Sequence, residues 1–373
     1  MSITSLLIAS CTQEAAPQEA AGSGDHSELV ADMQALIDES SSQPEFTDPG
    51  PALDASELEG ATIAVVAIDM NVPAIAEVTA SVQEVAEQIG LQTTTFDGEG
   101  NPSMVNQGLS QAINNEVDAI LSVGLVVDLI SGQIGEAKDA GIPMVDVINS
   151  PPVPDVDGQG SDPQMFANVA PDSEHVGRLL GATAIVETEG EANVIIMNTS
   201  ELTVAPAIVG GITEVLDQCE ACEYTTTDTE LVNWSTELQG QAGSAVRSDP
   251  DVNFVLPIYD AMTIFASSGI RQSGVRDVQM ASFNGTAPAL DLVLEGDIAV
   301  ANIAQNNDWA AWAAVDQAMR GMLGMEPAHP VLPTRYLTTA DLEAGSTASQ
   351  EVANEANFGT GYREGYLELW GVK

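Results

Sequence analysis

Six segments of the chain carry side chains that could hold a small polar molecule. Each follows an apolar run of strand length and offers amides, hydroxyls, carboxylates or an aromatic ring. The segments are Asp69-Met-Asn71, Asn149-Ser150, Asn198-Thr-Ser200, Tyr259-Asp260, Asn284-Gly-Thr286 and Gln305-Asn-Asn-Asp308. Amides and carboxylates form paired hydrogen bonds with neighbouring hydroxyls, so these residues could together bind a neutral polyhydroxylated ligand.

The same segments lack the groups that break covalent bonds. They contain no His or Cys that could act as a nucleophile or base near neutral pH. The chain has no G-x-G-x-x-G after its first strand, no G-x-x-x-x-G-K-[ST], no G-x-S-x-G and no H-E-x-x-H. Its three histidines are scattered, so we expect no metal site and no cofactor. The pattern favours a binding protein over an enzyme.

Alternating strands and helices must bring these segments together. Residues 62–68 form a continuous apolar run, which is typical of a parallel strand covered on both faces, and a helical apolar stripe closed by Gly90 follows. Further strands are predicted at 91–96, 117–123 and 144–148, with helices at 103–114 and 126–140. The pattern then restarts, with strands at 192–197, 223–227, 253–257, 278–283 and 298–304 and helices at 171–187, 204–216, 235–248, 261–273, 287–295 and 308–323.

This alternation predicts the α/β class, with two doubly wound parallel sheets in two successive lobes. In such sheets ligands bind outside the carboxyl ends of the strands. The six polar segments follow strands, so we expect them to meet there.

The charge balance excludes some partners. Nine Lys and Arg stand against 56 Asp and Glu, which gives a net charge of −47. The resulting negative field repels nucleic acid and anionic membrane surfaces. A net charge of this size also keeps a protein soluble and is compatible with adaptation to a saline medium. None of the nine basic residues lies in the six segments, so an acidic or phosphorylated ligand would lack an Arg or Lys partner. A neutral ligand is therefore preferred, with a cationic amine as the second choice.

The N-terminus predicts export. Residues 5–10 form a short run of apolar and small residues before Cys11, similar to a bacterial lipobox, and residues 12–24 have the composition of a tether. No basic segment precedes the run, so we expect the true start to lie upstream, with Cys11 as the lipidated residue. The alternative is an incidental apolar start of a cytoplasmic chain.

Cys219 and Cys222 form a C-x-x-C pair surrounded by acidic residues. No Lys or Arg lies between Arg178 and Arg247, so nothing nearby would lower a thiol pKa for redox catalysis. In an oxidising compartment the pair is expected to form a structural disulfide.

Several segments together resemble the ribose-binding-protein-like (type I) periplasmic sugar-binding proteins, over about residues 60–340. They are Ile63–Pro73, Phe96–Pro102, Gly141–Asn149, Val255–Met262, Ser282–Thr286 and Ile303–Asn306. The resemblance implies two lobes that close on a solute, joined by three hinge crossings near 168–170, 304–306 and 331–335. It also implies a monomer that delivers its solute to an ABC permease and touches the membrane only through its lipid anchor, either on the outer face of the cell membrane or in the periplasm.

The resemblance also divides the chain. It gives a truncated lipoprotein signal (1–11), a tether with a short helix (12–57), lobe 1 (58–168 with 306–332), lobe 2 (169–305 with 333–345) and a C-terminal tail (346–373).

Some site residues follow from the family motifs. Asn71 loosely matches the Asn before the first-strand Pro, Trp234 matches the stacking aromatic of the second lobe, and Gln305 matches the hinge Gln. Asn149, Tyr259 and Asn284 stand where the family has Arg, Asn and Asp.

Three further residues complete the expected site. Asp69 and Asp260 lie beside the matched positions, and Trp309 follows the hinge. Trp312, on another side of the same helix, is expected to pack in the core. Asp260 and Asp308 could instead cap the helices that they precede.

Other function classes remain in view. A tethered sensor that presents its ligand to a signalling receptor would have the same site, and the sequence does not separate it from a transport protein. The ligand-binding half of a repressor is disfavoured, because no helix-turn-helix precedes Gly60 and the charge opposes DNA.

Overall fold

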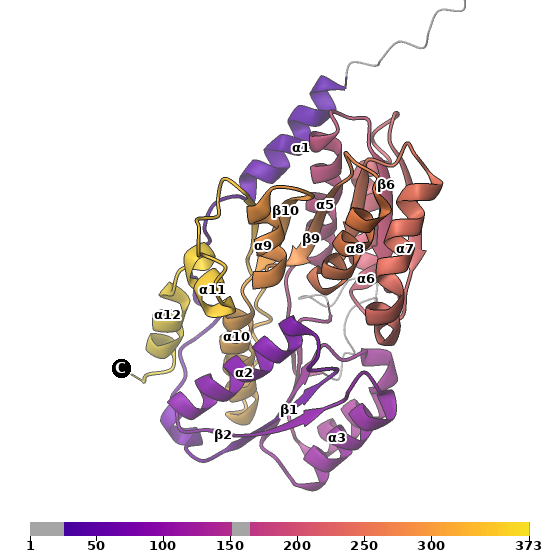
Figure 1. Cartoon of the computed structure of the whole chain (residues 1–373). Helices are drawn as coiled ribbons and strands as arrows, with labels where there is room; N and C mark the ends of the chain where they lie inside the picture. The colour runs from indigo at the N-terminus through magenta and orange to yellow at the C-terminus, as the bar shows by residue number, and fades with distance from the viewer. Residues whose placement is uncertain (1–25, 151–164, 373) are drawn as a thin grey trace, which may run out of the picture.

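The computed structural model describes residues 26–150 and 165–372, which form two α/β lobes (Figure 1). Lobe 1 contains a five-stranded parallel sheet in the order β2-β1-β3-β4-β5. Its strands are β1 (Thr62–Ala67), β2 (Gln92–Asp97), β3 (Ala119–Val123), β4 (Met144–Val147) and β5 (Ala167–Val169). The central strands β1 and β3 are almost entirely buried, as their continuous apolar sequences predict.

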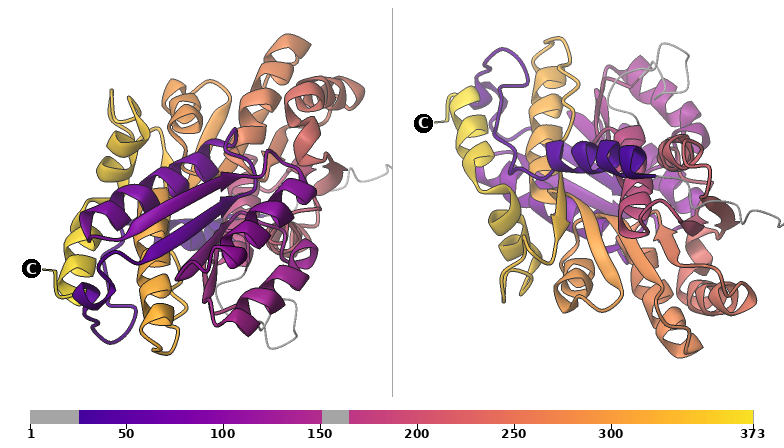
Figure 2. Two further views of the ribbon diagram at one scale, coloured as in Figure 1. Left: turned by 90° about the horizontal axis from the view of Figure 1, so that it is seen from below. Right: turned by 90° about the horizontal axis from the view of Figure 1, so that it is seen from above.

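Helices cover both faces of this sheet. On one face α2 (Pro73–Gln88) packs against α10 (Asn307–Met322), and on the other lie α3 (Pro102–Asn114) and α4 (Ser131–Ala140). The left view of Figure 2 shows strands of lobe 1 between α2 and α3. The helix expected over 126–140 is divided into a 3₁₀ turn, η2 (Val127–Leu129), and α4.

Lobe 2 repeats the strand order of lobe 1 in a six-stranded sheet, β11-β10-β9-β8-β6-β7, with β6 in the place of β1. Its strands are β6 (Asn193–Asn198), β7 (Glu223–Asp228), β8 (Phe254–Pro257), β9 (Gln279–Asn284), β10 (Ala299–Gln305) and β11 (Thr334–Thr338). Only β11 is antiparallel, and it extends the sheet beside β10. The two-lobe α/β fold predicted from the sequence is confirmed.

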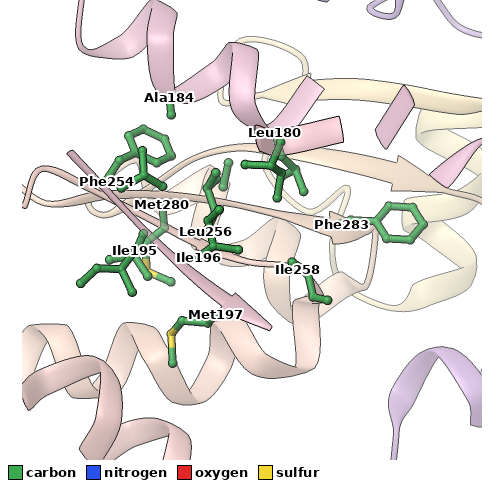
Figure 3. Packing of buried hydrophobic residues seen from close by; sticks show 14 of the residues in the cluster. Leu180, Ala184, Ile195, Ile196, Met197, Phe254, Leu256, Ile258, Met280 and Phe283 are labelled. Carbon is green, nitrogen blue, oxygen red and sulfur yellow. The ribbon is translucent and has the colours of Figure 1, made fainter. Parts of the chain in front are cut away.

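Helices also enclose the second sheet. They are α5 (Ser173–Glu187), α6 (Ala205–Leu216), α7 (Trp234–Ser248), α8 (Asp260–Ser273) and α9 (Ala287–Glu295), with α5 packed on α6 and α7 on α8. Figure 3 shows Leu180 and Ala184 of α5 facing the strands, where Phe254 and Leu256 lie in the same buried cluster. This core fixes the strands whose carboxyl ends carry the polar segments.

The chain passes between the lobes where β5 leads to α5, where β10 leads to α10, and where residues 331–333 lead to β11. The N-terminal segment also spans both lobes. Helix α1 (Ser27–Glu39) packs on α5, and residues 40–58, including η1 (Ala55–Leu58), reach lobe 1 (Figure 2, right). There the backbone N–H groups of Leu53 and Ala55 donate to the carbonyls of Leu369 and Trp370.

Residues 346–372, expected as a tail, contain two helices that pack beside α10: α11 (Gln350–Phe358) and α12 (Gly361–Leu369). The rings of Trp312 and Trp370 stack with centroids 5.3 Å apart, and Tyr362 and Tyr366 are buried beside them. Trp312 is therefore a packing residue, as predicted, and the C-terminal segment is part of the lobe 1 core.

Cys219 and Cys222 form a disulfide between the end of α6 and the start of β7. It lies at the amino ends of the strands, away from the loops that carry the predicted site. Cys11 lies outside the described residues. Within 26–150 and 165–372, the structure contains no helix long and apolar enough to cross a membrane.

Candidate ligand cleft between the lobes

A cavity lies between the lobes at the carboxyl ends of their strands. It encloses about 580 Å³ of empty space, part of it open to solvent. Lobe 1 contributes Ile68, Val72, Pro73, Ala74, Ile75, Gly124, Ile148 and Asn149, and lobe 2 contributes Leu202, Leu231, Trp234, Tyr259, Ala261, Asn284 and Thr286. No charged side chain belongs to this lining among the described residues. The cavity therefore suits an uncharged ligand with both apolar and hydrogen-bonding surface.

Tyr259 carries a buried hydroxyl that is available to a ligand. It precedes α8, it is 9% exposed, and its hydroxyl has no hydrogen-bond partner in the described part of the chain. Burial raises the pKa of this phenol far above its usual range, so the group is neutral and can both donate and accept. An unpartnered buried hydroxyl costs about 1–3 kcal/mol, and a bound solute would remove that cost.

Trp234 stands beside Tyr259 on the lobe 2 wall. Its indole N–H donates to the backbone carbonyl of Thr229 at 3.2 Å, which fixes the ring as α7 begins. The ring centroids of Trp234 and Tyr259 are 6.2 Å apart, and Phe283 lies behind Tyr259 at 6.3 Å. The predicted stacking residue therefore faces the cavity as part of an aromatic wall.

Two residues of the lining have strained backbones. Asn284 has φ 136° and Ile148 has φ 63°, in a region that side chains with a β-carbon rarely adopt. Such strain persists where the surroundings impose it, and it clusters at ligand sites. The Asn284 side chain makes no hydrogen bond to another described residue, so its amide can serve a ligand.

Asp260 holds the loop that carries Asn284. Its carboxylate accepts hydrogen bonds from Ser282 Oγ (2.6 Å), Asn302 Nδ2 (2.6 Å), and both the backbone N–H (2.7 Å) and hydroxyl (2.9 Å) of Thr286. It is fully buried, and burial raises its pKa against the effect of those donors. Asp260 does not line the cavity. Its expected contact with the ligand is replaced by a positioning role, because its oxygens are already occupied.

The side chain of Asn149 bridges two loops of lobe 1. Its Nδ2 group donates to the backbone carbonyls of Gly124 (3.1 Å) and Leu125 (2.7 Å), which joins the loops after β3 and β4. The side chain can therefore act only as an acceptor towards a solute. The predicted amide therefore lies on the cavity wall, and its two hydrogen bonds fix which way the amide group is turned.

Asp69 and Asn71 do not line the cavity. Asp69 Oδ1 accepts from the backbone N–H and the side-chain amide of Asn71, both at 2.8 Å, so the two residues form a local turn in an exposed loop. Val72 and Pro73 line the wall at this point. The one-residue shift between Asn71 and the expected position before Pro73 explains the difference.

Gln305 lies in the hinge rather than on the cavity wall. Its Nε2 donates to Asn307 Oδ1 at 2.8 Å, and its Oε1 is buried without a partner among the described residues. Asn307 in turn donates to Glu77 Oε2 at 2.6 Å. Burial raises the pKa of Glu77 to about 7, with a further contribution from the charge of Asp260.

Trp309 was expected at the cleft edge, and the structure places it elsewhere. Its ring stacks on Tyr362 of α12 with centroids 4.6 Å apart, and Phe46 lies 6.2 Å away. Asp308 accepts from the hydroxyl of Tyr362 and from Arg363 Nε, so it anchors α12; Asn306 caps α10 instead. Trp309 belongs to this aromatic cluster because the C-terminal helices cover the side of α10 that carries it.

The sequence reasoning missed the apolar side chains of the cleft. Ile68, Ile148 and Leu202 follow β1, β4 and β6 directly or within a few residues. Their positions after strands are a signal that could have found them, because the loops after parallel strands line the ligand site whatever their polarity. Thr286, the last residue of the polar segment Asn284-Gly-Thr286, also lines the cavity.

Comparison with known proteins identifies the family to which this chain belongs. Residues 63–324 match the family model described as "Periplasmic binding protein domain". The chain belongs to the periplasmic binding protein family. Its members are substrate-binding proteins that act outside the cytoplasm, so the family and fold predicted from the sequence are confirmed.

Individual relatives are distant. The D-apiose import binding protein of Actinobacillus succinogenes is 23% identical over 269 residues, which cover 71% of this chain and 77% of that protein. Among solved structures, a 5-methylthioribose transporter solute-binding protein from Thermotoga lettingae has a TM-score of 0.73 at 18% identity, covering 86% of this chain and all of that one. An ABC transporter solute-binding protein from Agrobacterium vitis with bound allitol has a TM-score of 0.68 at 16% identity, covering 76% and 96%.

Proposed function

We propose that this periplasmic binding protein is the solute receptor of an ABC importer and that it binds a neutral sugar or polyol between its lobes. The observation that carries the proposal is the unpartnered hydroxyl of Tyr259, buried in a cavity whose other polar groups are the amides of Asn149 and Asn284 and the hydroxyl of Thr286. Hydroxyl-rich solutes match such groups in number and kind. The similarity to proteins named for apiose, allitol and methylthioribose agrees with this ligand class.

The charges support a neutral ligand. Several of the basic residues form ion pairs outside the cleft: Arg178 with Glu174, Arg271 with Glu295, Arg320 with Asp316, and Arg363 with Asp308. An acidic solute would find no guanidinium or ammonium on the described cavity wall, and a cationic solute would find no carboxylate there. The cationic amine that the sequence left as second choice therefore has no support in this lining.

Titration calorimetry with a panel of solutes tests the proposal. The panel comprises neutral pentoses, hexoses and polyols, including apiose and allitol, beside sugar phosphates and sugar acids. We expect binding of at least one neutral member and none of the acidic ones. Tight binding of a phosphate or acid, with no neutral solute bound, would overturn the proposal.

The Tyr259→Phe variant separates binding from folding. It removes only the hydroxyl, which has no partner to lose among the described residues, so stability should stay unchanged or rise slightly. Affinity for the neutral solute should fall at least tenfold. Tyr224→Phe is the matched control, because its hydroxyl donates to Asp217 on the far side of lobe 2 and should not affect affinity.

We further propose that the protein is lipid-anchored at Cys11 and acts as a monomer with a membrane permease. Mass spectrometry of the membrane fraction, from cells that express the gene from its natural locus, should find an acylated Cys11. A Cys11→Ser variant should be released into the soluble fraction. Light scattering should give the monomer mass.

A further inference from the structure

A second hollow lies in the same cleft, next to the cavity at Tyr259. It encloses about 480 Å³ of empty space, part of it open to solvent. Ile68 from lobe 1 and Leu202 and Leu231 from lobe 2 line both hollows. The two hollows are therefore neighbours that share three apolar side chains.

The second hollow is built for apolar contact. Apart from the shared residues, its side chains include Val105, Leu125, Leu129 and Ile130 from lobe 1 and Val232 from lobe 2. Side chains of this kind bind a ligand through dispersion attraction and through the release of water from apolar surface, and they form no hydrogen bonds with it.

The two polar side chains of this hollow, Asn101 and Glu201, each accept a hydrogen bond from a backbone N–H group of a neighbouring segment. Asn101 Oδ1 accepts from the backbone N–H of Ser103 at 2.9 Å and caps α3. The Glu201 carboxylate accepts from the backbone N–H of Leu231. Both residues therefore stabilise the surrounding loops, and the other side chains of the lining are apolar.

Two large apolar side chains at this hollow are exposed to solvent. Leu129, in η2 of lobe 1, is 53% exposed, and Val232, in η3 (Leu231–Asn233) of lobe 2, is 62% exposed. Each lobe thus presents a large apolar residue to the same space. A ligand group placed between them would remove both from water when the lobes close.

We infer that the solute is amphiphilic, with a neutral polar head at Tyr259 and a short uncharged alkyl group in the second hollow. The inference rests on the proposed function, because the head is the sugar or polyol of that proposal. Because Ile68, Leu202 and Leu231 line both hollows, the two spaces are neighbours, and one molecule with a head and an alkyl group is the occupant that reaches both.

Calorimetry on the full chain tests the inference. The ligands are neutral pentoses and hexoses and their propyl ethers, in which the propyl group is attached at the anomeric carbon or at the terminal hydroxyl. Each buried methylene raises affinity about fourfold, so at least one propyl derivative should bind ten times more tightly than its parent sugar. If parent sugars bind and every derivative binds no better, the alkyl subsite is refuted while the proposed function stands. If neither sugars nor derivatives bind and an acidic solute does, both are refuted.

Two exposed positions give variants that should still fold. Leu129→Gln and Val232→Gln should each lower affinity for the best propyl derivative at least fivefold and leave affinity for the parent sugar within twofold. The matched control is Val352→Gln, a 40% exposed valine on α11 that lines neither hollow and should change nothing. Equal losses for the parent and the derivative would contradict the inference.

Discussion

Asn307 Nδ2 donates a hydrogen bond of 2.6 Å to Glu77 Oε2, and this contact links the hinge to helix α2 of lobe 1. Asn307 Oδ1 accepts from Gln305 Nε2 at 2.8 Å, and Gln305 is the last residue of β10 in lobe 2. Three polar side chains therefore connect the two lobes. The carboxylate at the end of this connection is mostly removed from water.

The first prediction is that Glu77 makes the protein less stable as the pH rises. Burial raises the pKa of Glu77 from 4.5 to about 7, so the folded state favours the protonated form. This contribution to stability is fully present below about pH 4.5 and is lost as the pH rises through 7. Glu77→Gln should therefore be more stable than the natural protein at pH 8, by up to about 3 kcal/mol, and should lose that advantage at pH 5.

Urea unfolding at pH 5 and pH 8 measures this difference. Glu84→Gln is the matched control, because Glu84 lies exposed on the same helix and its substitution removes the same charge. The expected result is a strong pH dependence of the Glu77→Gln effect and a weak one for Glu84→Gln. Equal pH dependence in the two variants would show that general charge repulsion, not burial of Glu77, is responsible.

The second prediction is that the C-terminal helices contribute to global stability. Trp370 is fully buried, stacks on Trp312, and donates from its indole N–H to Asp316 Oδ1 at 2.9 Å. Asp316 also pairs with the buried Arg320. Trp370→Ala should lower the free energy of unfolding by about 3–5 kcal/mol, because it leaves a large cavity and removes one donor from a buried carboxylate.

Chemical denaturation compares this variant with Val352→Ala, which changes an exposed residue on α11 and should alter stability by less than about 0.5 kcal/mol. If Trp370→Ala were as stable as the control, residues 346–372 would contribute little to stability, as a C-terminal tail would.

The fold could be predicted because apolar runs and helical stripes reveal strands and helices locally. The run at 62–68 predicted β1, and the repeated alternation predicted two lobes with one topology. The rule that ligands bind at the carboxyl ends of parallel strands then placed Asn149, Tyr259 and Asn284 at the cavity. These residues were accessible to sequence reasoning because each lies at or within two residues of the carboxyl end of a strand.

The rest depended on contacts between distant segments. Trp309 meets Phe46 and Tyr362, and no local pattern indicates that the chain brings these three rings together. Asp260 looked like a ligand contact or a helix cap, and its actual partners include Ser282 and Asn302, on two other strands. Hydrogen-bond networks of this kind follow from sheet order and register, which the sequence does not specify.

The last prediction is that Asp260 controls ligand affinity without touching the ligand. Its carboxylate accepts four hydrogen bonds, two of them from Thr286, which lines the cavity. Asp260→Asn would replace one acceptor oxygen by an NH₂ group that faces donors, and the loop from Asn284 to Thr286 would lose its anchor. We expect a loss of about 1–3 kcal/mol in stability and a fall of at least tenfold in solute affinity.

Ser282→Ala removes a donor from the same carboxylate but leaves Thr286 bonded, so it should lower stability and keep affinity within twofold. Denaturation and calorimetry on both variants separate the two effects. Unchanged affinity in Asp260→Asn, at any cost in stability, would show that the loop holds its ligand-binding shape without this carboxylate.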